Sequence, residues 1–434
     1  MPGGHPHGGA SRTPGRPGTS GGPPPMDFDR APFVVIWETT QACDLACRHC
    51  RAEAQPLRHP GELSTDEAKA MLTRVREFGP VIFVFSGGDA LKRPDIVELV
   101  RHGADLGMRM AMTPATTPLC TPQMMHDLKD AGLIRLAVSL DGSTPAIHDT
   151  FRRVEGSFAH GLRILQQAQQ IGLSTQVNTV VRRDNLADMD AMCALMTQVG
   201  IVFWEVFFLV PMGRAKPEDV AGAEGFEEVF EKLYRLSTTA PFDIKATAAP
   251  QYARVVMQRK HAEHLAQPVA ANAGPVQLDV MTAGRHHSDK DGIGRARNVN
   301  DGDGFLFISH TGDIFPSGFL PIRAGNLRTD DLVEVYRTSP VFLSLRDRRQ
   351  LKGKCGVCNF RGFCGGSRAR AYAVTGDPLE AEPFCAYTPP RWRQLIEEGA
   401  ALPDHEYFAR RSVLDAGTEP LIAGVRLANR AAHR

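Results

Sequence analysis

Strand-like and helix-like segments alternate through the first half of this chain, and this alternation constrains its fold more than any other feature. Six apolar runs rich in β-branched and aromatic residues are separated by stretches with apolar residues at helical spacing. Such alternation predicts an α/β fold with a parallel sheet. The predicted strands are 33–37, 81–85, 108–112, 134–140, 175–181 and 202–210, and the predicted helices lie near 64–78, 94–106, 121–131, 157–171 and 185–199.

Three cysteines follow the first predicted strand, where a parallel sheet carries functional loops. Cys43, Cys47 and Cys50 stand in the run Cys-Asp-Leu-Ala-Cys-Arg-His-Cys. This spacing supplies three thiolates, one fewer than a four-iron cluster takes, so a cluster held here keeps one iron free for a ligand other than protein. Structural zinc is the alternative, but it takes four closed ligands, and His49 lies too near Cys50 in sequence to complete the set.

A second group of cysteines lies near the carboxyl end of the chain, interleaved with glycines that permit tight turns. Its members are Cys355, Cys358, Cys364 and Cys385. Four thiolates can close around a zinc ion or an iron-sulfur cluster, and spacing alone leaves both open. Cys120 and Cys193 are interpreted as bystanders. Nine clustered cysteines argue against a disulfide framework and favour a reducing, cytoplasmic setting.

The first cysteine run resembles the signature of the radical S-adenosylmethionine (radical SAM) superfamily. The resemblance implies a partial, TIM-like barrel of six β/α units, with a 4Fe-4S cluster on Cys43, Cys47 and Cys50. It implies that the open iron binds the amino and carboxylate groups of S-adenosylmethionine. An electron from the cluster would then yield a 5'-deoxyadenosyl radical that abstracts hydrogen from a substrate. In that superfamily the residue before the last cysteine is commonly aromatic, whereas here it is His49.

Polar groups at other strand ends are candidates for binding that cofactor. The resemblance implies that the turn Ser86-Gly87-Gly88-Asp89 contacts its amino group, and the alternative is a plain strand-to-helix turn. It assigns the ends of the fourth and fifth strands to ribose and carboxylate contacts, against helix capping as the alternative. The candidates are Gly87, Gly88, Asp89, Ser139, Asp141 and Asn178. Arg152 and Arg153 are also considered, although such a pair in a loop is usually solvated.

The second cysteine group resembles the SPASM or twitch extension of the same superfamily, which implies one auxiliary 4Fe-4S cluster. Closer still, residues 28–389 are similar to the branch that includes enzymes of d1-type haem biosynthesis and of the alternative haem pathway. That similarity rests on the runs 42–52, 207–211 and 365–372. Known activities in this branch remove or oxidise tetrapyrrole side chains, whereas other SPASM proteins modify ribosomally made peptides.

Three functions therefore compete. The first is a radical enzyme acting on a tetrapyrrole side chain in haem-type cofactor biosynthesis, and the second is a peptide or protein maturase. Either would need a small-molecule or peptide substrate and a reducing electron donor of the flavodoxin or ferredoxin type. The third is a non-catalytic iron-sulfur electron carrier, in which a site with only three cysteine ligands would have no role. Arg361, Arg368 and Arg370 could meet propionates or offset the charge of a cluster.

Composition bounds the domain organisation and the classes of partner. The 434 residues, 42% of them hydrophobic, suffice for one large domain and a smaller one. A net charge of +1 favours neither nucleic acid nor an acidic membrane, and no apolar run is long enough for a transmembrane helix. We expect a disordered Gly/Pro-rich leader over 1–26, the barrel over 28–211, a helical and loop connector over 212–304, a SPASM/twitch-like domain over 305–390 that begins with a hairpin, and a helix and tail over 391–434.

Overall fold

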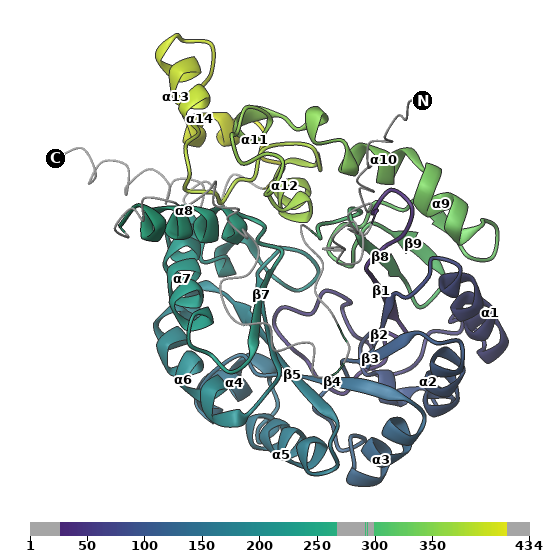
Figure 1. The fold of residues 1–434 in the computed structure, drawn as a ribbon. Helices are drawn as coiled ribbons and strands as arrows, with labels where there is room; N and C mark the ends of the chain where they lie inside the picture. Colours follow the sequence, from purple (N-terminus) through teal and green to yellow (C-terminus); the bar gives the residue numbers. More distant parts are fainter. Residues whose placement is uncertain (1–26, 267–290, 292, 294–298, 415–434) are drawn as a thin grey trace, which may run out of the picture.

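The computed structural model describes residues 27–266, 291, 293 and 299–414. Within these residues a ten-stranded sheet has the order β10-β9-β8-β1-β2-β3-β4-β5-β6-β7. Every neighbouring pair from β8 to β7 is parallel, and the strands curve into an open barrel with helices outside (Figure 1). The α/β fold with a partial barrel is therefore confirmed. The expected leader over 1–26, the stretch 267–290 and the tail from 415 lie outside the described residues.

The six predicted strands are all present, and two further parallel strands extend the sheet. The predicted strands correspond to β1 (Val34–Glu38), β2 (Ile82–Ser86), β3 (Arg109–Met112), β4 (Leu133–Ser139), β5 (Ser174–Val181) and β6 (Phe203–Phe208). The additions are β7 (Asp243–Thr247), from the segment expected to be a connector, and β8 (Phe305–Ile308). The predicted hairpin is confirmed, because β8 pairs antiparallel with β9 (Asp313–Phe315), which in turn pairs with β10 (Gly325–Asn326).

The helices cover the outer face of the barrel and bury their apolar stripes against it (Figure 1). Helix α1, for example, begins at a capping box formed by Ser64 and Glu67 and buries Leu72 completely. Burial of such a side chain contributes about 1.5–3 kcal/mol. The helices are α1 (Thr65–Arg76), α2 (Ile96–Asp105), α3 (Pro122–Asp130), α4 (Pro145–Arg152), α5 (Ser157–Gln170), α6 (Met189–Val199), α7 (Gly222–Ser237) and α8 (Gln251–Ala266).

The carboxyl-terminal segment carries the second cysteine group and packs onto the barrel through hydrogen bonds donated by Arg370. Arg370 and Glu382 are both fully buried, with 2.8 Å between Nε and Oε1. Arg370 also donates to the carbonyl oxygens of Phe208, Leu209 and Ala248, which follow or end β6 and β7. The segment contains α9 (Leu332–Thr338), α10 (Pro340–Arg346), α11 (Gly353–Gly356), α12 (Arg368–Thr375), α13 (Pro390–Glu397) and α14 (Asp404–Ala409).

None of the described helices is both long and apolar enough to cross a membrane.

Candidate active site

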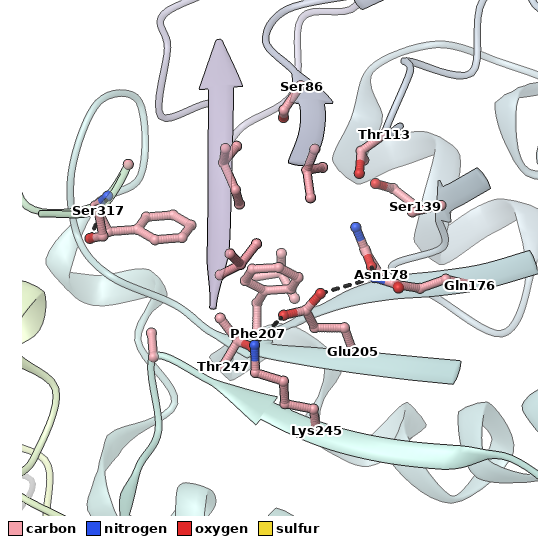
Figure 2. Close-up of a pocket in the computed structure, with 18 of the residues that line it drawn as sticks. Ser86, Thr113, Ser139, Gln176, Asn178, Glu205, Phe207, Lys245, Thr247 and Ser317 are labelled. Carbon is pink, nitrogen blue, oxygen red and sulfur yellow. Dashed lines mark hydrogen bonds and ion pairs between the residues drawn. The ribbon is translucent and has the colours of Figure 1, made fainter. Parts of the chain in front are cut away.

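The barrel encloses a cavity of about 560 Å³, which lies within the size range of ligand sites (Figure 2). Its lining brings together groups that are far apart in the sequence: the first cysteine triplet, the glycine turn after β2, and polar side chains of β4 and β5. Of the residues singled out from the sequence, those that line it are Cys43, Cys47, Cys50, Gly87, Gly88, Ser139 and Asn178.

Each thiol of the triplet receives one N–H donor. The backbone N–H of Leu45 lies 3.4 Å from Cys43 Sγ, and that of Ala54 lies 3.4 Å from Cys50 Sγ. Arg152 Nη1 donates to Cys47 Sγ over 3.6 Å. Such donors stabilise thiolates and the sulfurs of iron-sulfur clusters, so this set of three fits a cluster. Burial raises the pKa of Cys43 to about 12, and iron binding there would therefore release a proton.

The glycine turn after β2 holds the segment that leads into Cys43. Gly88 N–H donates to Thr40 O, and Asp89 N–H donates to Ala42 O, both over 2.7 Å. A Cβ on Gly87 would lie 2.5 Å from Thr40 O, and one on Gly88 would lie 2.5 Å from Ala42 O. The two glycines are therefore required for the close approach of two backbone segments, besides facing the cavity.

Replacing Gly87 by alanine is expected to displace the triplet loop. Gly87 has φ +140°, so an alanine there combines backbone strain with a clash against fixed backbone. We expect a loss of about 1–3 kcal/mol of stability and poor iron retention after anaerobic reconstitution. Gly79→Ala is the matched control, since its φ is +98° but nothing lies within 4 Å. Urea unfolding and iron analysis measure both effects; full iron retention in Gly87→Ala would contradict this role.

Two carboxylates expected to contact the cofactor are absent from the residues that line the cavity. Asp89 is fully buried and accepts from Leu91 N–H, Ala115 N–H and Thr117 Oγ1. Asp141 is also fully buried and accepts from Val180 N–H at 2.8 Å and from Arg152 Nε at 2.6 Å. Both carboxylates therefore fix the loops around the site, because every bond they make is to the protein itself.

The position of Arg152 in the site was not predicted from the sequence. Instead of being solvated, its side chain is 11% exposed, pairs with Asp141 and lines the cavity beside Cys47. Burial raises the pKa of Asp141, but the charge of Arg152 and neighbouring cations outweighs burial and holds it at about 2. Arg153, in contrast, is exposed. No sequence signal joins Arg152 to Cys47, since 105 positions separate them.

His49, which replaces the usual aromatic residue, stacks on Phe151. Their ring centroids lie 4.6 Å apart with planes 12° from parallel, and His49 lines the cavity. Burial and the nearby Arg152 lower the pKa of His49 to about 3, so the ring is neutral at ordinary pH. The imidazole therefore supplies a flat, uncharged surface beside Cys50.

One polar row and one apolar row of side chains cross the strands that line the cavity. Glu205 of β6 accepts from Gln176 Nε2 at 2.9 Å, Thr247 Oγ1 at 2.6 Å and Lys245 Nζ at 3.2 Å (Figure 2). A polar row runs in register across β4 to β7, and an apolar row runs across β8 and β1 to β3. The polar row consists of Ser139, Asn178, Glu205 and Lys245. The apolar row consists of Phe307, Ile36, Val84 and Ala111.

The second cysteine group lines a separate, smaller cavity. Backbone N–H groups lie 3.4 Å from the Sγ atoms of Cys355, Cys358 and Cys364, so these thiols have the same kind of donor as the triplet. Burial raises the pKa of Cys385 to about 12. Among the described residues, no three or more His, Cys, Asp or Glu side chains are arranged to hold a single metal ion.

Arg368 places a buried positive charge beside Cys355 of the second cysteine group. It is 1% exposed and donates to the carbonyls of Gly366, Pro378 and Glu380, with Nη2 3.9 Å from Cys355 Sγ. Within the described chain it has no ion pair at 4.0 Å or less, so an anionic group among the cysteines would offset its charge. Arg368 and Arg370 are both buried away from the barrel cavity, and contact with substrate propionates is not supported for either.

Comparison with known proteins gives three findings. Residues 37–196 match the family model described as the radical SAM superfamily. Two AdoMet-dependent heme synthases are similar along nearly their whole length: that of Nitratidesulfovibrio vulgaris is 39% identical over 82% of this chain and 93% of its own, and that of Methanosarcina barkeri 38% over 83% and 97%. The crystal structure of Streptococcus suis SuiB bound to S-adenosylmethionine shares the fold, with a TM-score of 0.59 and 15% identity over 82% of this chain and 78% of that chain.

Proposed function

This chain belongs to the radical SAM superfamily, and on that premise we propose that it modifies a tetrapyrrole side chain in the biosynthesis of a haem-type cofactor. The observation that carries the proposal is the 38–39% identity to the two heme synthases, which extends over 82–83% of this chain. At such a site a 4Fe-4S cluster supplies the electron that cleaves S-adenosylmethionine to a 5'-deoxyadenosyl radical, the species that abstracts hydrogen from the substrate.

The cysteine triplet is proposed to hold that cluster, and the adjoining polar strand ends to hold S-adenosylmethionine. Support comes from the shared cavity, which Gly87, Gly88, Ser139 and Asn178 line together with the three thiols. Arg152 keeps a positive charge against Cys47 and is held in place by Asp141. Cys355, Cys358, Cys364 and Cys385 are proposed to hold one auxiliary 4Fe-4S cluster, which the N–H donors and the charge of Arg368 support.

The polar row and the apolar row of the cavity support a tetrapyrrole as substrate. A tetrapyrrole has a flat apolar ring and carboxylate-bearing side chains, which match the apolar and polar rows of the barrel. Lys245 is the cation best placed for a substrate carboxylate, because its side chain is 38% exposed and its one ion pair is to Glu205 at 3.2 Å. Arg135, the other strand cation at the cavity, is instead buried and paired with Asp291.

Replacing Lys245 by methionine is expected to weaken binding of a carboxylate-bearing tetrapyrrole about 10- to 100-fold, because a hydrogen bond to a charged group contributes about 1.5–3 kcal/mol. Titration of the protein into the tetrapyrrole, followed by visible absorbance, gives the Kd. Lys245→Arg is the control that keeps the charge, and it should bind with little change. Equal affinity of Lys245→Met and the parent protein for the tetrapyrrole would show that Lys245 does not contact the substrate.

The proposed reaction is tested with anaerobically reconstituted protein, a strong reductant and S-adenosylmethionine. Iron-bound tetrapyrroles that carry propionates are offered as haem precursors, and 5'-deoxyadenosine and the tetrapyrrole mass are measured. We expect formation of 5'-deoxyadenosine coupled to a loss of mass from the tetrapyrrole. If no tetrapyrrole binds or stimulates cleavage while a peptide does, the protein is a maturase. Absence of 5'-deoxyadenosine under every condition would leave only an electron carrier.

A further inference from the structure

Gln251 is a buried amide at the auxiliary cysteine site with no partner for its side chain. It is the first residue of α8, it is 1% exposed, and it lines the same small cavity as Cys355, Cys358, Cys364 and Cys385. Neither Nε2 nor Oε1 has a hydrogen-bond partner among the residues that the structure describes. Buried polar groups are nearly always hydrogen-bonded, so this amide marks a place where a further group is expected.

The neighbouring turn of α8 presents a second donor to the same cavity. Arg254 is 6% exposed and donates through Nη2 to Glu227 and through Nη1 to Gln258, but its Nε has no partner in the described part of the chain. Gln251 and Arg254 are three residues apart and therefore share one face of the helix. Residues with unused donors thus line the cavity that the four cysteines line, and thiolate or sulfide sulfur can only accept hydrogen bonds.

We infer that Gln251 donates an N–H to a sulfur of the auxiliary cluster and thereby raises its reduction potential. The inference rests on the proposed function only in requiring a cluster on the four cysteines. Donors to cluster sulfurs stabilise the more negative, reduced state, and such bonds are a known determinant of potential. Gln251 is a positioning residue, because it acts on the cluster and touches neither substrate nor S-adenosylmethionine.

The position of Gln251 is fixed by both parts of the molecule. The turn 248–250 joins β7 to α8, and Arg370 Nη2 from the auxiliary segment donates to Ala248 O over 2.8 Å. Lys245 and Thr247, on the strand before this turn, line the barrel cavity. The proposed donor to the auxiliary cluster therefore lies one turn beyond β7, the strand that carries Lys245 of the proposed substrate site.

The test uses the full chain with Cys43, Cys47 and Cys50 replaced by alanine, so that only the auxiliary cluster is present. Gln251→Leu and Gln251→Glu are compared with this parent, and Gln394→Leu, an exposed glutamine of α13, is the matched control. Iron per chain is counted, and the midpoint potential is measured by redox titration followed by electron paramagnetic resonance. We expect unchanged iron, an equilibrium constant for reduction about tenfold lower in Gln251→Leu, which is 59 mV for one electron, and no change in Gln394→Leu.

Three outcomes would overturn the inference, and they are distinguishable. A parent without iron removes the auxiliary cluster itself, and with it that part of the proposed function. A parent with about four irons whose potential is the same in Gln251→Leu and Gln251→Glu leaves the cluster and removes only the role of Gln251. If Gln251→Leu does not fold, Gln251→Met is measured in its place, because methionine lacks the donor and adds no charge: a lower potential supports the donor, and an unchanged one overturns it.

Discussion

Replacing Cys47 by alanine is expected to abolish reductive cleavage of S-adenosylmethionine. Cys47 is one of three thiols on a site that has no fourth cysteine, and its Sγ is the one that Arg152 contacts. Two thiolates do not hold a four-iron cluster, so about four irons per chain should be lost from this site. Formation of 5'-deoxyadenosine by the anaerobically reduced protein, measured by chromatography, should fall to background.

Cysteine-to-alanine substitutions at other positions distinguish loss of this cluster from general damage to the protein. Cys193→Ala changes a half-buried cysteine of α6 outside both groups and should keep full cleavage. Cys358→Ala should lower the iron content of the auxiliary site yet retain uncoupled cleavage. Equal loss of cleavage in Cys47→Ala and Cys358→Ala would show that the auxiliary cluster is structural or is the point where electrons enter. Undiminished cleavage in Cys47→Ala would refute the assignment of the triplet.

Replacing Arg370 by methionine is expected to be the most destabilising single change away from the cysteines. It leaves Glu382 fully buried without its cation and removes the donor to three carbonyl oxygens at the ends of β6 and β7. Breaking a buried pair in this way costs about 3–5 kcal/mol. Because Glu382 N–H also donates to Cys355 Sγ, iron at the auxiliary site should fall as well. Urea unfolding and iron analysis report the two effects separately.

Two variants control this prediction. Arg349→Met removes an exposed arginine whose pair with Asp347 is at the surface, and it should leave stability nearly unchanged. The double variant Arg370→Met with Glu382→Gln removes the stranded charge and should recover part of the loss. If Arg370→Met unfolds at the same urea concentration as the parent, Arg370 does not hold the carboxyl-terminal segment on the barrel.

The barrel could be predicted from the sequence as far as its strands are apolar. The first six predicted strands are present because each buries one face under helices, which leaves a run of apolar residues in the sequence. Strand β7 was not predicted because every second residue, Asp243, Lys245 and Thr247, is polar and lines the cavity. A strand that lines a ligand site on its inner face lacks the apolar signal on which such predictions depend.

For the candidate site, the residues whose chemistry is local were predictable, and those that depend on distant partners were not. The cysteine spacings and the Gly87-Gly88 turn are visible in short windows of sequence. Asp89 and Asp141 have the right residue type, but their carboxylates turn toward protein donors that no local pattern reveals. Arg152 was undervalued for the same reason, since Asp141 and Cys47 meet it only in the folded barrel.

The place of β1 in the sheet imposes an order on the biogenesis of the protein. The strand that leads into the cysteine triplet lies between β2 and β8, and Glu38 at its end meets His310, 272 positions later in the chain. During synthesis β1 therefore cannot pair with β8 until most of the polypeptide has left the ribosome. Iron delivered before then would meet a β1 strand that is unpaired on one side, so we expect a cluster on the triplet to be inserted only after β8 has paired with β1.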